Sequence, residues 1–286
     1  MVKTQLHKTL LLLLAATAFS SHLGAATVAY WRFEDAGGSP TTNGQTVTTV
    51  TDSVGTRTGT AIGTPTYATT PFQNPIPQTG ATNLMALNNG ADQGVLIPSG
   101  GVGNLFGSSF TIEAYIDVTS FGGGNARSIF RSRDSNSFPV SLGLTSQNTP
   151  GTSNSLSFAL TGNGAATVNY ATPLTLNTTY FVAATYDGTN MKLYLDGNLV
   201  GSAAYSGFNP TNIKSAIGDD PQFPTGFGAS FLGYIDEVRI SDAALLPSQF
   251  LNAVPEPSSS AMLGLGLLGL GFVVVRRQKK GALVQK

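Results

Sequence analysis

Short alternating segments separated by turn residues constrain this chain more than any other feature of its sequence. In TYFVAATYDGTNMKLYLDGNLVGSAA, Asp-Gly pairs at 187–188 and 196–197 interrupt three apolar, strand-like runs. Asp-Gly supplies the positive φ angles that tight hairpin loops require. We therefore expect an antiparallel meander with strands over 180–186, 191–195 and 199–203.

The segment FTIEAYIDV, residues 110–118, shows the same two-residue period. Its apolar residues occupy every second position, which predicts a strand with one buried face. Residues 41–78 are rich in Thr, Gly, Pro and Asn and predict an irregular excursion carrying a strand or two. Residues 242–253 predict a closing helical turn with Pro247 near its start. The fold class expected for the middle of the chain is an all-β antiparallel sandwich or barrel.

The two ends of the chain differ from its middle. At the N-terminus, Lys3 and Lys8 precede an apolar stretch and then small residues, so residues 1–26 resemble a signal peptide cleaved after Ala25 or Ala26. Residues 261–275 carry no charge and are followed by Arg and Lys residues. This pattern predicts a transmembrane helix with a basic cytoplasmic tail over 276–286, and an exported domain before it.

Composition excludes several classes of function for the exported domain. The chain has no Cys, so the domain has no disulfide. Between residues 27 and 254 there are eight Lys or Arg and fourteen Asp or Glu residues, a net charge of −6, which disfavours nucleic acid as a partner. Both histidines, His7 and His22, fall in the expected signal peptide. A Ser-His-Asp triad and a histidine-based zinc site are therefore excluded from the mature domain.

Several segments, taken in order along the chain, resemble the laminin-G-like, concanavalin A-like jelly-roll family. The strongest combination is the YDG and LYLDG run at 186–197 followed by IDEVRI at 235–240. The other matching segments are YWRFED at 30–35, DSVG at 52–55, FTIEAYI at 110–116 and IGDD at 217–220. The resemblance covers residues 27–252 and implies a two-sheet antiparallel jelly-roll sandwich, with Trp31 in its core.

The C-terminal end resembles a second known pattern, the PEP-CTERM sorting signal. Its three parts are VPEP at 254–257, a Gly-rich apolar segment and the terminal basic cluster. Pro255, Glu256 and Pro257 form the core of the motif, within a linker over 253–260. The resemblance implies processing by an exosortase-type membrane enzyme of bacteria, and release to or attachment at the cell surface or extracellular matrix.

Catalysis by a carboxylate pair is not indicated by the sequence. Some jelly rolls of this kind are glycoside hydrolases with the signature E-x-D-x-x-E, which is absent here. Glu113 and Asp117 share a strand face, but four residues span about 13 Å along a strand. A retaining hydrolase needs carboxyl groups about 5 Å apart. We expect both residues to be solvated charges on a sheet face.

Asp236 is the most informative carboxylate, because it alternates with apolar residues in FLGYIDEVRI and is therefore expected to face inward. A buried carboxylate must be hydrogen-bonded, paired or bound to metal. The family resemblance implies a calcium site formed by Asp236, Glu34 and the carbonyl of Gly55 near Asp52, since Ca²⁺ prefers oxygen ligands. The alternative is that Asp236 accepts backbone N–H groups or pairs with Arg32.

For ligand binding, Tyr115 and Tyr194 alternate out of the apolar sets of their strands, and Arg131 and Arg133 lie in the polar segment FRSRDSN. Exposed aromatic rings can stack on sugars while polar groups fix orientation; the alternative is that all four residues are ordinary surface. We expect an exported, non-catalytic binding or structural module whose partner is an extracellular polysaccharide or surface glycoprotein. The alternatives are a polysaccharide-active hydrolase or lyase with a non-standard site, and a purely architectural matrix protein.

Overall fold

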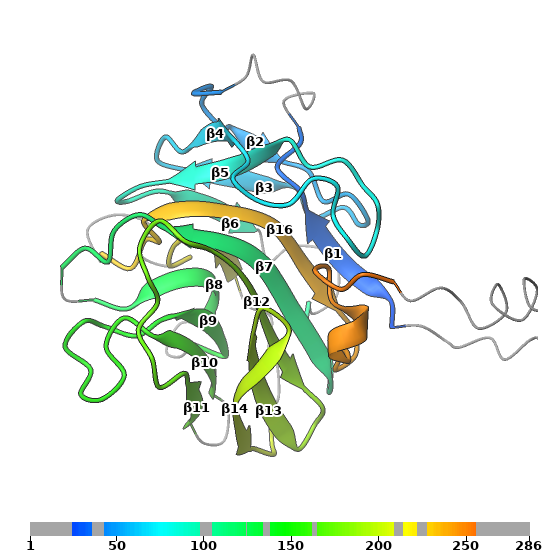
Figure 1. Cartoon of the computed structure of the whole chain (residues 1–286), viewed down its shortest axis with the longest axis vertical. Helices are drawn as coiled ribbons and strands as arrows, with labels where there is room; N and C mark the ends of the chain where they lie inside the picture. Colours follow the sequence, from blue (N-terminus) through cyan, green and yellow to red (C-terminus); the bar gives the residue numbers. More distant parts are fainter. Residues whose placement is uncertain are drawn as a thin grey trace, which may run out of the picture. The chain divides into compact units, whose positions relative to one another are not determined.

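The computed structural model describes residues 25–35, 43–97, 105–123, 125–133, 138–161, 165–208, 214–221 and 228–255. The apolar part of the expected signal peptide, the predicted membrane helix at 261–275 and the basic tail at 276–286 lie outside these ranges. Across the described ranges, no helix has the length and apolarity needed to cross a membrane. The described residues form two antiparallel sheets of eight strands each (Figure 1).

The first sheet is built around two long neighbouring strands, β7 and β16, which pair along most of their length. β1 and β5 pair with different parts of β16 on its other side, β5 with 233–235 and β1 with 238–241. The strands are β14 (Asn198–Ala204), β13 (Asn190–Leu195), β12 (Thr179–Tyr186), β7 (Phe110–Val118), β16 (Gly233–Ser241), β5 (Met85–Asn89), β4 (Thr66–Thr69) and β1 (Thr27–Trp31).

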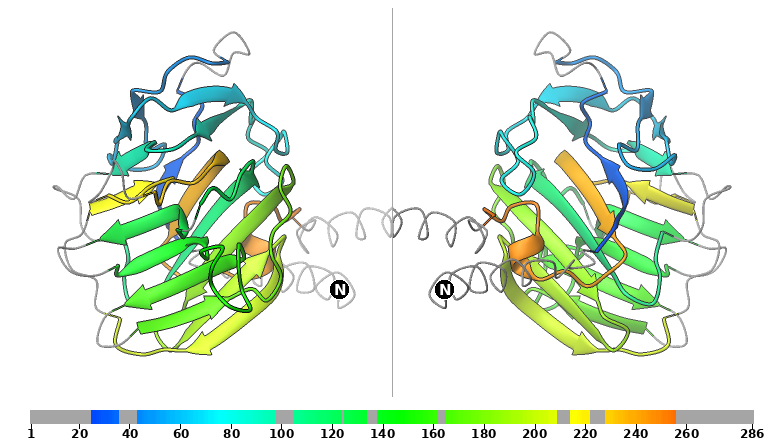
Figure 2. Two further views of the ribbon diagram at one scale, coloured as in Figure 1. Left: turned by 90° about the vertical axis from the view of Figure 1, so that its left-hand side faces the viewer. Right: turned by 90° about the vertical axis from the view of Figure 1, so that its right-hand side faces the viewer.

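The second sheet is formed largely by the middle of the chain and is completed by three short strands from the N-terminal third. In spatial order its strands are β11 (Ala165–Asn169), β10 (Leu156–Thr161), β9 (Val140–Leu144), β8 (Arg127–Arg133), β15 (Lys214–Ile217), β6 (Gly94–Ile97), β3 (Gly59–Ile62) and β2 (Thr49–Val50). Figure 2 shows the two sheets as facing layers of a sandwich. This confirms the all-β fold class expected from the sequence.

The local predictions agree with the strands. The meander is formed by β12, β13 and β14, with Asp196 and Gly197 at positive φ in the second turn. The described part of the excursion over 41–78 carries three short strands, where one or two were expected, and the closing turn is the 3₁₀ helix η2 (Pro247–Gln249). The Asp-Gly pairs therefore determine where the hairpins turn, because they can adopt the positive φ angles that a tight turn requires.

Aromatic and aliphatic side chains fill the space between the sheets. Trp31, Phe110, Phe130 and Phe158 are fully buried there, and the Trp31 indole N–H donates to the carbonyl oxygen of Arg57 at 2.8 Å. All five alternate apolar residues of β7 belong to this core. The predicted inward face of β7 and the core position of Trp31 are confirmed.

The outer face of the first sheet is buried as well. A second apolar cluster covers it, to which the loop between β4 and β5 contributes Phe72 and Ile76 and the C-terminal segment contributes Phe250 and Leu251. As a result, every residue of β7 is buried. The polar residues on this face are therefore placed in a covered layer, where each needs a partner.

Candidate functional site

A β-bulge in β16 places two consecutive carboxylates in that covered layer. The register of β16 against β7 shifts between Asp236, opposite Tyr115, and Arg239, opposite Glu113, so β16 has one extra residue. Glu237 adopts a φ of +50°, which accommodates the irregularity. Simple alternation predicted that Asp236 points to the same face of β16 as Val238 and Ile240, which lie in the inter-sheet core. That prediction is wrong because the bulge reverses the alternation.

Asp236 is fully buried and has donors on both carboxylate oxygens. The Thr70 hydroxyl donates to Oδ2 at 3.0 Å, and the Glu237 backbone N–H donates to Oδ1 at 2.8 Å. Burial raises the pKa of Asp236 well above its usual value, and the charge of Glu237 raises it further. The neutral acid is therefore favoured over the carboxylate more strongly here than in water.

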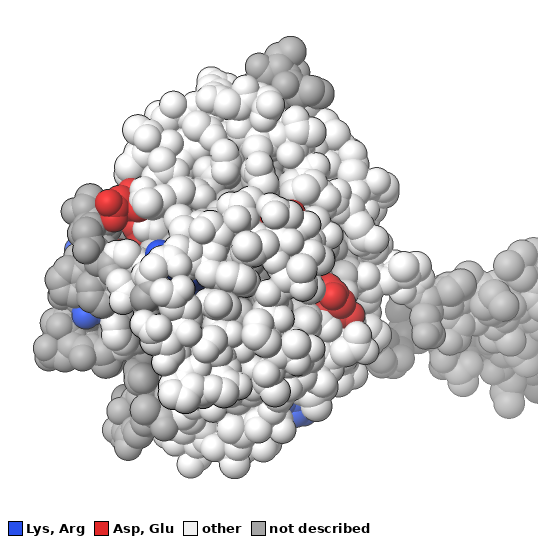
Figure 3. Space-filling view, turned by 60° about the vertical axis from the view of Figure 1, so that its left-hand side comes forward, with Lys and Arg blue, Asp and Glu red and all other residues white. Residues whose placement is uncertain are grey.

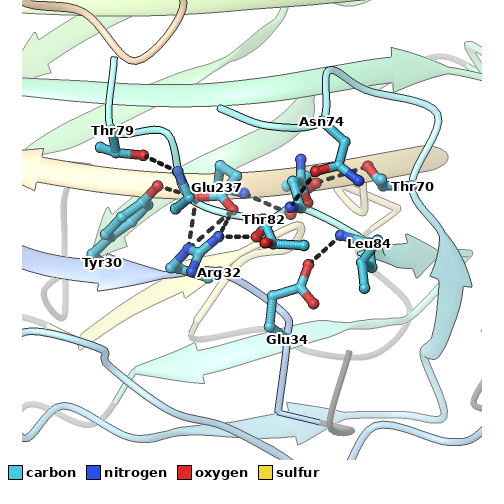
Figure 4. Close-up of polar contacts among 12 residues, drawn as sticks. Tyr30, Arg32, Glu34, Thr70, Asn74, Thr79, Thr82, Leu84 and Glu237 are labelled. Carbon is cyan, nitrogen blue, oxygen red and sulfur yellow. Dashed lines mark hydrogen bonds and ion pairs between the residues drawn. The ribbon is translucent and has the colours of Figure 1, made fainter. Parts of the chain in front are cut away.

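Glu237 is held by two residues of the N-terminal strand region (Figure 4). The Tyr30 hydroxyl donates to its Oε2, and the Arg32 guanidinium forms an ion pair with it at 2.9 Å. Arg32 also donates to the Thr82 carbonyl in the β4–β5 loop at 2.5 Å. Burial raises the pKa of Glu237, and Arg32 and Tyr30 oppose that rise. The partner of Arg32 is thus Glu237, a residue that the sequence analysis did not single out.

Glu34, a second member of the expected calcium set, also has protein donors, and the Gly55 backbone contacts Asp52 through its N–H. Glu34 accepts the backbone N–H groups of Leu84 at 2.6 Å and Met85 at 3.0 Å, which fixes the end of the covering loop. The Gly55 N–H donates to Asp52 Oδ1 at 2.9 Å. Within the described ranges, no group of three or more His, Cys, Asp or Glu side chains has the arrangement of a metal site. Calcium binding by Asp236, Glu34 and Gly55 stays a prediction, to which these contacts add no support.

Tyr115 and Tyr194 belong to the second cluster. Their exposed fractions are 5% and 6%, and their rings contact Phe181 and Phe250 at centroid distances of 5.1 Å each. The expectation that these tyrosines stand exposed is therefore wrong. The covering segments are distant in sequence from both strands, so the strand pattern alone could not reveal them.

Glu113 and Asp117 are also buried rather than solvated. Arg239 pairs with Glu113 at 2.6 Å, and the Leu251 N–H donates to the other oxygen of Glu113 at 2.9 Å. Arg239 in turn donates to the Gln249 carbonyl at 2.9 Å. Glu113 therefore serves to hold the C-terminal segment against the sheet.

Arg131 and Arg133 converge on one buried carboxylate at the second sheet. They reach Asp220 Oδ2 at 3.3 and 2.8 Å, and both guanidinium groups stack on the Phe138 ring at 4.8 and 4.2 Å. Burial lowers the pKa of Arg131, and Asp220 opposes that change. These contacts hold the Arg131 side chain on the outer face of the second sheet.

A groove of about 320 Å³ lies on this outer face of the second sheet. Its floor follows two rows of paired residues across neighbouring strands, and the turn after β9 contributes Thr145, Ser146 and Thr149 to its wall. Gly143 is required in the floor because a Cβ there would collide with the Arg127 carbonyl oxygen. The rows are Arg131, Ser141, Ala159 and Thr167, and Gly143, Ser157 and Asn169.

Small side chains make the groove hollow, and their hydroxyl and amide groups make it polar. The residues that line it include no Asp, Glu or aromatic side chain. On the face drawn in Figure 3, most of the described surface is neither acidic nor basic. Two arginines, Arg127 and Arg131, also line it, and Arg131 is the member of the predicted ligand set found there. The groove is thus suited to hydrogen bonding with a polar ligand.

The sorting motif lies at the edge of the described residues. Pro255 is the last of them, and Glu256 and Pro257 lie outside. The profile of the PEP-CTERM protein-sorting motif matches residues 253–278, which confirms the motif. This match marks the chain as one exported and sorted to the surface.

The family of the domain follows from a second match. The profile of the concanavalin A-like lectin/glucanase superfamily, in its laminin G form, matches residues 89–249, more than half of the chain. The protein belongs to this superfamily, as its two antiparallel sheets indicate. Curated protein sequences give no match to the chain.

Solved structures with a similar fold include domain 4 of AbnA, a GH43 extracellular arabinanase from Geobacillus stearothermophilus, in complex with arabinotriose. It has a TM-score of 0.57 and 18% identity, over 81% of this chain and 99% of that one. The binding domain of botulinum neurotoxin DC in complex with SialylT has a TM-score of 0.51 and 17% identity, over 79% of this chain and 49% of that one.

Trypanosoma rangeli sialidase in complex with sialic acid has a TM-score of 0.52 and 12% identity, over 78% of this chain and 32% of that one. The chain thus spans nearly all of the AbnA domain, about half of the toxin fragment and about a third of the sialidase. At these identities the likeness shows the fold alone.

Proposed function

We propose that this protein is an exported, non-catalytic module that binds glycan at the cell surface or in the extracellular matrix. The observation that carries the proposal is the groove on the second sheet, whose floor offers hydroxyl and amide groups from three adjacent strands. A polysaccharide presents many hydroxyl groups along an extended chain, so a groove across strands can bind several of them. Solved structures of this fold that hold arabinotriose and SialylT lend support.

Binding without hydrolysis is supported by the placement of the carboxylates. The residues lining the groove include no acid that could protonate a leaving group or attack a sugar. Glu113 is engaged by Arg239 and Leu251 on the other sheet, below the covering cluster. The alternative, a polysaccharide-active hydrolase or lyase with a non-standard site, has no feature of the groove in its favour.

In this proposal the sorting motif determines how the protein is exported and processed. The segment 261–275 holds the chain in the membrane, with 276–286 in the cytoplasm, while an exosortase-type enzyme acts near 255–257. The domain then reaches a surface glycoprotein or exopolysaccharide partner. The supporting observation is the match of the motif over residues 253–278.

The test is binding of the mature domain to a panel of neutral and acidic bacterial polysaccharides. Ser157→Tyr fills the floor of the groove and is expected to weaken binding about tenfold or more. Ser202→Tyr, at an exposed position of β14 in the other sheet, is the matched control and is expected to bind normally. Equal affinity of the two variants would overturn the groove assignment.

Two further results would count against a binding module. Absence of saturable binding to the whole panel would favour a purely architectural protein. Release of reducing sugars that is abolished by Asp117→Asn would favour the hydrolase.

A further inference from the structure

The outer face of the first sheet contains a second pocket, of about 460 Å³, which shares no residue with the groove. It is bounded by the start of the β4–β5 loop at 71–73, the N-terminal end of β12 and the turn between β13 and β14. Tyr115 and Asn252 complete its lining. Its volume lies in the range of small-molecule sites in proteins, about 300–1,000 Å³.

Two polar groups of the pocket lining lack a protein partner. The Tyr115 hydroxyl and the Asn252 side-chain oxygen are both buried and have no hydrogen-bond partner among the described residues. A buried polar group left without a partner costs about 1–3 kcal/mol. A bound molecule that supplies hydrogen bonds to these groups would recover that cost.

The rest of the lining combines aromatic rings with one carboxylate. Phe72 and Phe181 flank Tyr115 at centroid distances of 5.7 and 5.1 Å. Asp196 is fixed at the rim because its Oδ1 accepts the Phe181 N–H at 2.8 Å. The lining residues include no Lys, Arg or His. This charge distribution disfavours an anionic ligand.

We propose that this pocket binds one neutral sugar residue. A sugar ring has an apolar face that can pack on Phe72 or Phe181, and hydroxyl groups that can both donate and accept. Its hydroxyls would donate to Asn252 and Asp196 and accept from Tyr115. The domain would then carry two saccharide sites on opposite outer faces of the sandwich, one for an extended chain and one for a single residue.

The experiment is calorimetric titration of the mature domain with methyl glycosides of glucose, galactose and arabinose, and with methyl glucuronide as the charged counterpart. We expect saturable binding of at least one neutral glycoside, and binding of the glucuronide that is weaker by about tenfold or more, because Asp196 repels its carboxylate. Asp196→Asn keeps the acceptor for Phe181 and should reduce this discrimination.

Variants separate the pocket from the groove. Asn252→Leu should lower the affinity about tenfold, whereas Asn88→Leu, at an exposed position of β5, is the control and should not. Tyr115→Phe should leave the melting temperature unchanged or higher, because it removes a hydroxyl without a partner, and should lower the affinity.

Three results would overturn the inference. They are no saturable binding of any neutral glycoside, unchanged affinity in Asn252→Leu, and loss of binding in the groove variant Ser157→Tyr alone. The last result would leave the proposed groove in place. Conversely, glycoside binding that survives Ser157→Tyr and fails in Asn252→Leu supports the pocket even if no polysaccharide binds the groove.

Discussion

The ion pair between Glu113 and Arg239 is expected to be the most consequential single contact of the covered face. Glu113 is fully buried, and its two oxygens accept from Arg239 and from the Leu251 N–H. Arg239→Met leaves the carboxylate in place without its cation. Breaking a buried pair from one side costs about 3–5 kcal/mol. At about 2–4 °C per kcal/mol for a domain of this size, the melting temperature should fall by about 6–20 °C.

Thermal and urea unfolding of the mature domain measure this loss. Lys192→Met removes a cation from a partly exposed position of β13 and is the matched control. It should change the free energy of unfolding by no more than about 0.5 kcal/mol. A loss below about 1 kcal/mol in Arg239→Met at pH 7 would refute the role given to the pair.

The pH dependence supplies a second check. Burial raises the pKa of Glu113, and Arg239 and the Leu251 N–H oppose that rise, so Arg239→Met should raise it further. A carboxyl whose folded pKa exceeds its unfolded value destabilises the fold as pH rises from the unfolded pKa through the folded one. The variant should therefore lose less stability at pH 4 than at pH 7. Equal losses at the two pH values would contradict this account.

Four further predictions concern other parts of the chain. Because burial raises the pKa of Asp236, the wild-type domain should lose stability as pH rises above about 4, and Asp236→Asn should flatten that dependence in urea unfolding. If Ca²⁺ is bound, EDTA should lower the melting temperature and Asp236→Ala should remove that sensitivity; an unchanged melt with EDTA rejects the calcium site. Intact-mass measurement should show a mature chain beginning at Ala26, whose backbone N–H donates to Asp242 Oδ1 at 2.8 Å; a chain beginning at residue 27 would exclude that contact. Alanine substitution of 255–257 should leave the chain unprocessed in the membrane fraction, and normal processing would reject the motif's role.

The fold was predictable from sequence because its strongest signals are local. Asp-Gly turns and two-residue alternation fix where strands begin and end, and each of these signals lies within a few neighbouring residues. The core face of β7 followed from the same alternation. The choice of a two-sheet sandwich over a barrel came from the family resemblance, and no pairing between strands distant in sequence was predicted.

The covered face was missed because its burial depends on segments far away in the chain. The alternation predicts that Glu113, Tyr115 and Asp117 point away from the core, and in the structure they lie outside the inter-sheet core. What buries them is the loop between β4 and β5 together with the C-terminal segment. Alternation assigns residues to faces, but it cannot say whether a second layer lies above a face.

The bulge at Asp236 has a physical reason that alternation also cannot express. On one side β16 pairs with β5 through 233–235 and with β1 through 238–241, so its neighbour changes at 236–237. At that change the Glu237 N–H donates to the Asp236 carboxylate. Glu237 then reaches Tyr30 and Arg32 at the end of the incoming strand. In this strand the two adjacent acids thus supply hydrogen-bond acceptors at the point where the regular ladder is interrupted.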